Sequence, residues 1–213
     1  MYLANNIKSG ITMGSTQMNS CDETESTILS LVEKAFTSAW TNPNNLSNNK
    51  RSSYFVSELS KEFEDRYKAT ALVQKTDPNG ERHTGEWLLD IAIVKTKEVG
   101  TDYKNRKTTV VDSIIWAIES EFSTYIKEFC KDFTKLLYIK ANGYLYIAGL
   151  NQTDKKAREN YIEAQKKLAT TLVESKEIKS PFFIVFIPSS GNGVWDEFKL
   201  EELISWFKCY KLA

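Results

Sequence analysis

The sequence predicts an α/β protein with a mixed sheet of about five strands flanked by helices. Several short segments are almost wholly apolar, which is typical of strands covered on both faces. Other segments repeat apolar residues at helical spacing. Three predicted strands follow one another before the first crossover helix, and helices and strands then alternate. That order requires both antiparallel and parallel neighbours in one sheet.

Two helices open the predicted order. From Glu25 to Trp40 apolar residues recur every three or four positions, and a loop rich in Asn follows at 41–49. The second helix carries an i, i+4 apolar stripe, formed by Phe55, Leu59, Phe63 and Tyr67. We predict a helical lead-in over residues 1–54 and an α/β core with a C-terminal helix over residues 55–213.

The predicted strands are short and rich in apolar or β-branched residues. They cover residues 69–75, 86–94, 110–122, 144–150 and 182–187. A turn containing Pro, Asn and Gly at 76–83 separates the first two strands. Residues 95–109 are polar and partly basic, and residues 104–107 are either an exposed loop or a contact for phosphates.

The second half adds two long helices, at 125–141 and 154–176, with Asp154 or Thr153 as the cap of the second. Residues 198–210 are predicted as a short helix or a helix followed by a strand. Four aromatic residues near the C-terminus are candidates for an exposed patch that supports a homodimer: Trp195, Trp206, Phe207 and Tyr210.

Composition restricts the classes of function. The 213 residues contain 28 Lys plus Arg and 28 Asp plus Glu, so a global positive field is excluded. No apolar run is long enough for a membrane span. The three cysteines are far apart, and a single histidine argues against a zinc site. We expect a reduced, cytoplasmic protein that does not enter a membrane.

Three carboxylates form the candidate site. Asp90 interrupts an apolar strand, and a buried carboxylate must meet a cation, a metal or a proton. Glu119 and Glu121 are two residues apart on another strand, so they project from the same face. If the two strands are neighbours, the three acids converge, and oxygen ligands of this kind suit Mg²⁺ or Mn²⁺.

Two simpler interpretations remain open. An Asp followed later by Glu-x-Glu is common in surface β-hairpins, and buried acids can also meet Lys or Arg partners. The apolar flanks of Asp90 and Glu119 favour burial over a solvated face. The next helix carries Lys131 and Lys135, whose charges could reach back toward the acids.

These motifs resemble those of the PD-(D/E)XK, or restriction-endonuclease-like, superfamily of nucleases. Its core resembles the order above: a helix with an acid, three strands, a helix and a strand. Asp90 matches the acid on the second strand, and Glu119-Ser120-Glu121 matches (D/E)-x-K with Glu in place of Lys. Glu58 or Glu62 matches the acid on the preceding helix. The resemblance covers residues 55–150.

The resemblance implies metal-dependent hydrolysis of phosphodiester bonds in nucleic acid, with DNA as the expected partner. Asp90 and Glu119 would hold Mg²⁺ or Mn²⁺, and Glu121 would be a further ligand or would position the water. Glu58 or Glu62 would assist through water, and Lys135 or Lys131 would replace the charge of the missing motif lysine.

The alternative is an inactive scaffold of the same fold that binds protein or nucleic acid. The sequence does not decide between DNA and RNA, and it shows neither a recognition sequence, a pathway nor an oligomeric state.

Overall fold

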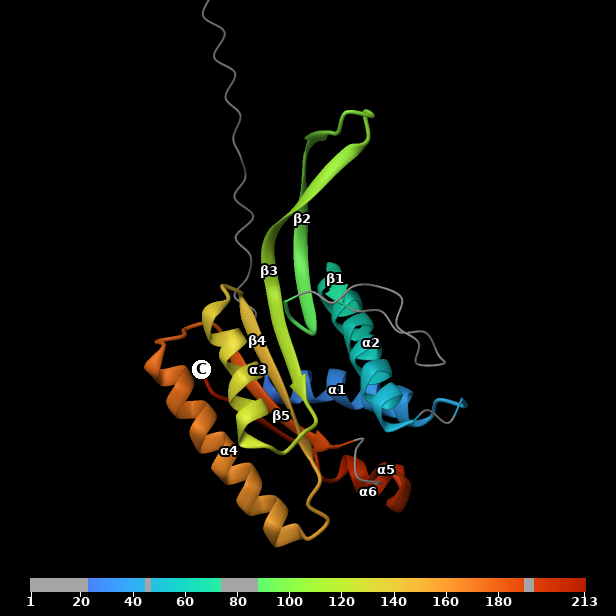
Figure 1. Cartoon of the computed structure of the whole chain (residues 1–213), viewed down its shortest axis with the longest axis vertical. Coiled ribbons are helices and arrows are strands. Elements are labelled where there is room, and N and C mark those ends of the chain that lie inside the picture. The colour runs from blue at the N-terminus through green and yellow to red at the C-terminus, as the bar shows by residue number, and fades with distance from the viewer. Residues whose placement is uncertain (1–22, 45–46, 74–87, 190–193) are drawn as a thin grey trace, which may run out of the picture.

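One six-stranded sheet lies between two layers of helices in the computed structural model of the chain (Figure 1). The structure describes residues 23–44, 47–73, 88–189 and 194–213. The start of the predicted lead-in and the turn predicted at 76–83 lie outside these residues. Together the described parts form one hydrophobic core to which helices and strands from both ends of the chain contribute.

Six helices belong to the described chain: α1 (Glu25–Trp40), α2 (Asn48–Tyr67), α3 (Ile126–Tyr138), α4 (Lys155–Ser175), α5 (Val194–Glu197) and α6 (Leu200–Ile204). Thr24 caps α1 by accepting a hydrogen bond from Thr27 N. Asp154 caps α4 in the same way through Ala157 N, which confirms one of the two predicted caps.

The strands follow the chain order across the sheet. They are β1 (Thr70–Val73), β2 (Ile91–Thr101), β3 (Lys107–Glu121), β4 (Gly143–Leu150), β5 (Phe182–Pro188) and β6 (Lys208–Lys211). β1, β2 and β3 form an antiparallel meander, β3, β4 and β5 are parallel, and β6 is antiparallel to β5. The prediction of a mixed α/β sheet is therefore confirmed, with six strands where about five were expected. The additional strand is β6, from the segment predicted as a helix or a helix–strand piece.

The two faces of the sheet are covered by different helices. Trp116 on β3 packs against Phe63 and Tyr67 of α2. Three positions later Glu119 meets Lys135 of α3, so it lies on the opposite face. Figure 1 shows α1 and α2 behind the sheet and α3 and α4 in front of it. The predicted boundary between residues 54 and 55 lies inside α2.

β2 and β3 continue beyond the sheet as a two-stranded arm, residues 95–112 (Figure 1). Most of its side chains are exposed. Cross-strand ion pairs join Lys97 to Asp112 at 2.8 Å and Lys107 to Glu98 at 2.9 Å. The sequence did not predict these strands between 95 and 109, because polar residues with no core to cover lack the apolar signal of the other strands.

The aromatic patch expected near the C-terminus is wrong as a surface feature. Trp195, Trp206 and Phe207 are buried, and Tyr210 is half-buried. Phe36 of α1 packs edge-on against the rings of Trp195 and Phe207. These aromatic residues therefore attach α1 to the C-terminal segment, and a homodimer cannot use them without unfolding that contact.

Gly149 on β4 lies directly against the chain beyond β3. A Cβ at this position would come within 2.7 Å of Phe122 Cα and 2.8 Å of Phe122 O. Both are backbone atoms, which cannot swing away. We expect Gly149→Ala to destabilise the fold by about 2 kcal/mol or more, measured by denaturant unfolding, whereas Thr109→Ala on the exposed arm should change it by less than about 0.5 kcal/mol. Equal effects would contradict this packing.

In the described parts of the chain, none of the helices has the length and apolar character needed to cross a membrane.

Candidate metal centre

Asp90 lies immediately before β2, next to the first residues of β2 that pair with β3. The pairing of Ile91 with Ile118 places it beside the end of β3, which confirms that the two predicted strands are neighbours. Ser120 donates both its backbone N–H and its hydroxyl to Asp90 Oδ2, at 2.8 and 2.7 Å. Asp90 was expected in the middle of a strand. It instead closes a bend at residues 88–90, and the two bonds to Ser120 fix it there.

Glu119 is the most deeply buried acid of the site, with 1% of its surface exposed. Its Oε2 lies 3.2 Å from Lys135 Nζ of α3. Its Oε1 is buried and has no hydrogen-bond partner among the residues that the structure describes. A buried carboxylate oxygen without a partner is costly, so this atom is a place where a cation or a proton would be stabilised.

The charge states follow from this environment. Burial, and then the charge of Asp90, raise the pKa of Glu119 to about 8, although Lys135 opposes the shift. Burial also raises the pKa of Asp90 against the two bonds from Ser120. Burial alone would lower the pKa of Lys135, but Asp132 and Glu119 raise it on balance. Lys135 is therefore charged, while Glu119 holds a proton over much of the neutral range.

A second group of acids lies next to the first. Ligand oxygens of Glu121, Glu128 and Asp132 all lie within 4.8 Å of one another. Ser123 N–H donates to Glu121 Oε1 at 2.6 Å. Lys135 Nζ contacts Asp132 Oδ1 at 2.9 Å as well as Glu119, so one ammonium group joins the two groups of acids.

Four of the five predicted site residues are brought together. Asp90, Glu119, Glu121 and Lys135 all lie around the junction of β3 and α3. Glu119 and Glu121 both face α3, as their spacing predicted.

The fifth residue, Glu58, lies elsewhere. It accepts a hydrogen bond from Ser38 of α1 at 2.8 Å and pairs with Lys61 at 2.5 Å. Glu62 is 3.8 Å from Lys34. Because α2 covers the other face of the sheet, neither acid is near the cluster on the α3 face.

Sequence reasoning missed Glu128, Asp132 and Tyr146 as members of this region. The i, i+4 spacing of Glu128 and Asp132 places both on one face of α3, beside the apolar stripe of Phe129 and Phe133. That spacing was the available signal. Tyr146 carried no such signal, because only the pairing of β3 with β4 places it opposite Glu119.

The contact between Ser120 and Asp90 gives a test of the local geometry. Ser120→Ala keeps the backbone bond and removes the hydroxyl bond to Asp90. We expect the free energy of unfolding to fall by about 1 to 2 kcal/mol at neutral pH. Guanidinium unfolding measures it, and Thr109→Ala on the arm is the control. An unchanged free energy would contradict the placement of Asp90.

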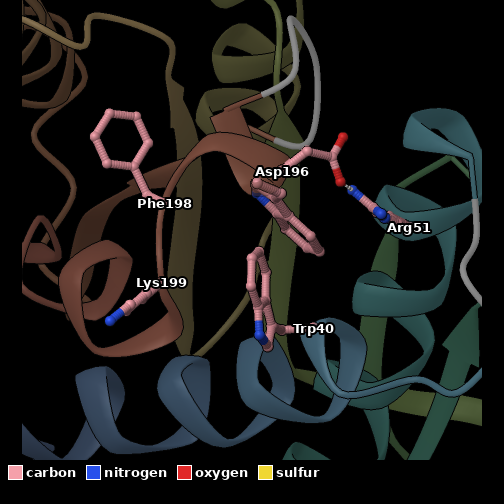
Figure 2. A pocket seen from close by; sticks show the side chains of 6 residues that line it. Trp40, Arg51, Asp196, Phe198 and Lys199 are labelled. Carbon is pink, nitrogen blue, oxygen red and sulfur yellow. Dashed lines mark hydrogen bonds and ion pairs between the residues drawn. The ribbon is translucent and has the colours of Figure 1, made fainter.

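A separate surface pocket lies on the opposite face of the sheet, between α1, α2 and α5 (Figure 2). Its lining includes Trp40, Trp195 and Lys199, and the acid in its wall, Asp196, is paired with Arg51 at 2.7 Å. None of the acids around β3 and α3 lines it. The pocket and the acidic region are therefore different features.

Taken together, five carboxyl groups surround two ammonium groups, those of Lys131 and Lys135. Such an excess of negative charge in a partly buried place favours protons or a divalent cation. The donors are all oxygen, which suits a hard ion such as Mg²⁺ or Mn²⁺ and not a soft one.

The fold and the site define an α/β protein with an acidic centre built by one sheet and one helix. Comparison with protein family models, curated proteins and solved structures finds no match to this chain.

Proposed function

We propose that the protein is a metal-dependent nuclease of the restriction-endonuclease-like fold, which hydrolyses phosphodiester bonds in nucleic acid. The observation that carries the proposal is the triad of Asp90, Glu119 and Lys135. It combines a buried carboxylate oxygen without a partner, a second acid from the neighbouring strand, and a lysine held on the same carboxylate.

The residues fit a hard cation. Glu119 Oε1 is the free buried oxygen, and the hydrogen bonds of Asp90 within the described chain fall on Oδ2. Glu119 and Asp90 are therefore the residues that would hold Mg²⁺ or Mn²⁺. Bound there, the ion would lower the pKa of a water and offset charge on the phosphate.

Lys135 supplies the positive charge that the motif lacks at Glu121. It reaches Glu119 from α3, one of the two lysines expected to do so. Its side chain is 31% exposed. The buried part holds the ammonium group in one orientation, and the exposed part leaves it accessible to a phosphate oxygen of a substrate. Lys131 pairs with Glu128 instead, at 3.4 Å.

The topology supports the same proposal. The segment from α2 to β4 runs helix, three antiparallel strands, helix, and a strand parallel to the third. This is the order that the sequence motifs led us to expect. Asp90 immediately before β2 and Glu119 near the end of β3 meet because those strands are antiparallel.

The substrate is expected to be DNA, and a homodimer would enlarge its contact surface. The formal net charge of zero means that binding depends on local cations. Lys127 and Lys131 on the exposed side of α3 lie on the same helix as Lys135 and are candidates for phosphate contacts.

The proposal is tested by incubating the full chain with Mn²⁺ or Mg²⁺ and single- and double-stranded DNA and RNA. We expect cleavage that needs the metal, stops with a chelator, and is lost in Asp90→Ala. Glu58→Gln is the matched control and should cleave as the wild type does, because Glu58 lies on the other face.

If no substrate is cleaved under any of these conditions, the nuclease proposal fails. A chain that binds nucleic acid without cleaving it would favour the inactive scaffold. Loss of cleavage in Glu58→Gln with an intact fold would contradict the assignment of the site to the α3 face.

A further inference from the structure

We propose a second divalent-cation site, formed by Glu121, Glu128 and Asp132 together with the hydroxyl of Tyr146. It would take a hard ion such as Mn²⁺, Mg²⁺ or Ca²⁺. It does not depend on the nuclease proposal, because it shares no ligand with Asp90 and Glu119.

The three carboxylates come from two elements that the fold holds rigidly. Glu121 ends β3, and Glu128 and Asp132 lie one turn apart on α3. Their oxygens lie within 4.8 Å of one another, which is the spacing of ligands around a single ion. Burial first, and then the nearby acids Asp132 and Glu128, raise the pKa of Glu121 against the bond from Ser123 N–H.

Local contacts leave these acids short of positive charge. Lys131 lies 3.4 Å from Glu128 and is 65% exposed, so water screens it. Lys135 contacts Asp132, but it also contacts Glu119, so its single positive charge serves two acids. Among the described residues, no basic side chain forms an ion pair with Glu121.

Tyr146 is the independent observation that points to a ligand. It is fully buried on β4, and its hydroxyl has no hydrogen-bond partner in the described parts of the chain. Its ring is fixed by edge-on contacts with Phe129 and Phe133, the α3 residues next to Glu128 and Asp132 in sequence. A buried phenol normally finds a partner.

Tyr146 pairs with Glu119 in the parallel register of β3 and β4, so its side chain lies on the α3 face of the sheet, the face that Glu121 and Asp132 also share. After burial, the charges of Glu121 and Asp132 are the strongest influences that raise its pKa. Glu121 likewise helps to raise the pKa of Tyr161 of α4 to about 12, after burial. Both phenols therefore stay neutral, and Tyr146 offers a fourth, uncharged oxygen beside three carboxylates. That donor set fits a hard cation.

The test counts Mn²⁺ bound to the full chain by electron paramagnetic resonance of free Mn²⁺, at pH 8. We expect two ions per chain. Glu128→Gln should leave one, and Tyr146→Phe should weaken one of the two roughly tenfold. Glu163→Gln, an exposed acid on α4 paired with Lys166 at 2.8 Å, is the matched control and should retain both ions. Circular dichroism melting checks that each variant is folded.

The outcomes separate the two proposals. Loss of one ion in Glu128→Gln and of the other in Glu119→Gln supports both sites. A single ion that is lost in Glu128→Gln but kept in Glu119→Gln supports this second site and contradicts the proposed nuclease centre. If Glu128→Gln and Tyr146→Phe bind Mn²⁺ with wild-type number and affinity, the second site is overturned.

Discussion

Glu119→Gln is expected to remove metal-dependent cleavage and to stabilise the metal-free protein above neutral pH. The variant keeps the shape of the side chain but cannot carry the charge that holds an ion. We expect cleavage to fall roughly a thousandfold, which corresponds to about 4 kcal/mol in the barrier. A plasmid cleavage assay with Mn²⁺ measures this change.

The gain in stability follows from the raised pKa of Glu119. Its value of about 8 lies above the ordinary 4.5, so between these values the unfolded chain has lost the proton while the native state keeps it. The free energy of unfolding of the wild type therefore falls as the pH rises through this window, and the loss is complete above pH 8. Glutamine removes the effect.

Denaturant unfolding with a chelator present tests the sign. At pH 4 the wild type and Glu119→Gln should be equally stable. At pH 9 the variant should be more stable by up to about 5 kcal/mol, the value that the shift of Glu119 implies. A variant that is less stable at every pH would show that Glu119 is ionised in a structural ion pair with Lys135, and would contradict the account.

Lys135→Met is expected to be the most destabilising single change at the site. It removes the one ammonium group that contacts both Glu119 and Asp132 in the described chain. Leaving buried acids without their cation should lower the free energy of unfolding by about 3 kcal/mol at pH 7 to 8. Cleavage should be lost as well. Lys135→Arg, which keeps the charge, is the control and should retain most of the stability.

Two further results distinguish an electrostatic role from simple packing. The deficit of Lys135→Met should be larger at pH 9 than at pH 6, because Glu119, whose pKa is about 8, is ionised at the higher pH and protonated at the lower one. Saturating Mn²⁺ should stabilise Lys135→Met more than it stabilises the wild type, because a bound ion replaces the missing charge. A deficit that is independent of both pH and Mn²⁺ would mean that Lys135 contributes only through its methylene groups.

Periodicity in the sequence was enough to predict the order of the main elements and the faces on which the candidate acids lie. The apolar runs around Asp90 and Glu119 correctly indicated two buried strands, which the structure shows to be neighbours, and the i, i+2 rule placed Glu119 and Glu121 on one face. Helical spacing also placed Lys135 within reach of the acids. These inferences succeed because strand and helix geometry is local.

Features that depend on tertiary placement could not be predicted. Glu58 lies on the helix that precedes the strands, where an acid of the site was expected. The helix α2 packs on the other face of the sheet, and the sequence pattern does not specify which face a helix covers. Tyr146 joins the acids only through the parallel register of β3 and β4. Aromatic residues such as Trp206 gave the same signal for a surface patch as for a core, and the fold buries them.

The most direct measurement is an anomalous difference map from crystals soaked in Mn²⁺. The account predicts a peak with oxygens of both Glu119 and Asp90 at ligand distances of about 2.0 to 2.6 Å. It also predicts that Lys135 remains beside Glu119. A map that shows no Mn²⁺ at Glu119 and Asp90 at saturating metal, whether or not an ion binds at Glu121, Glu128 and Asp132, would contradict the central claim that Glu119 and Asp90 form a metal centre.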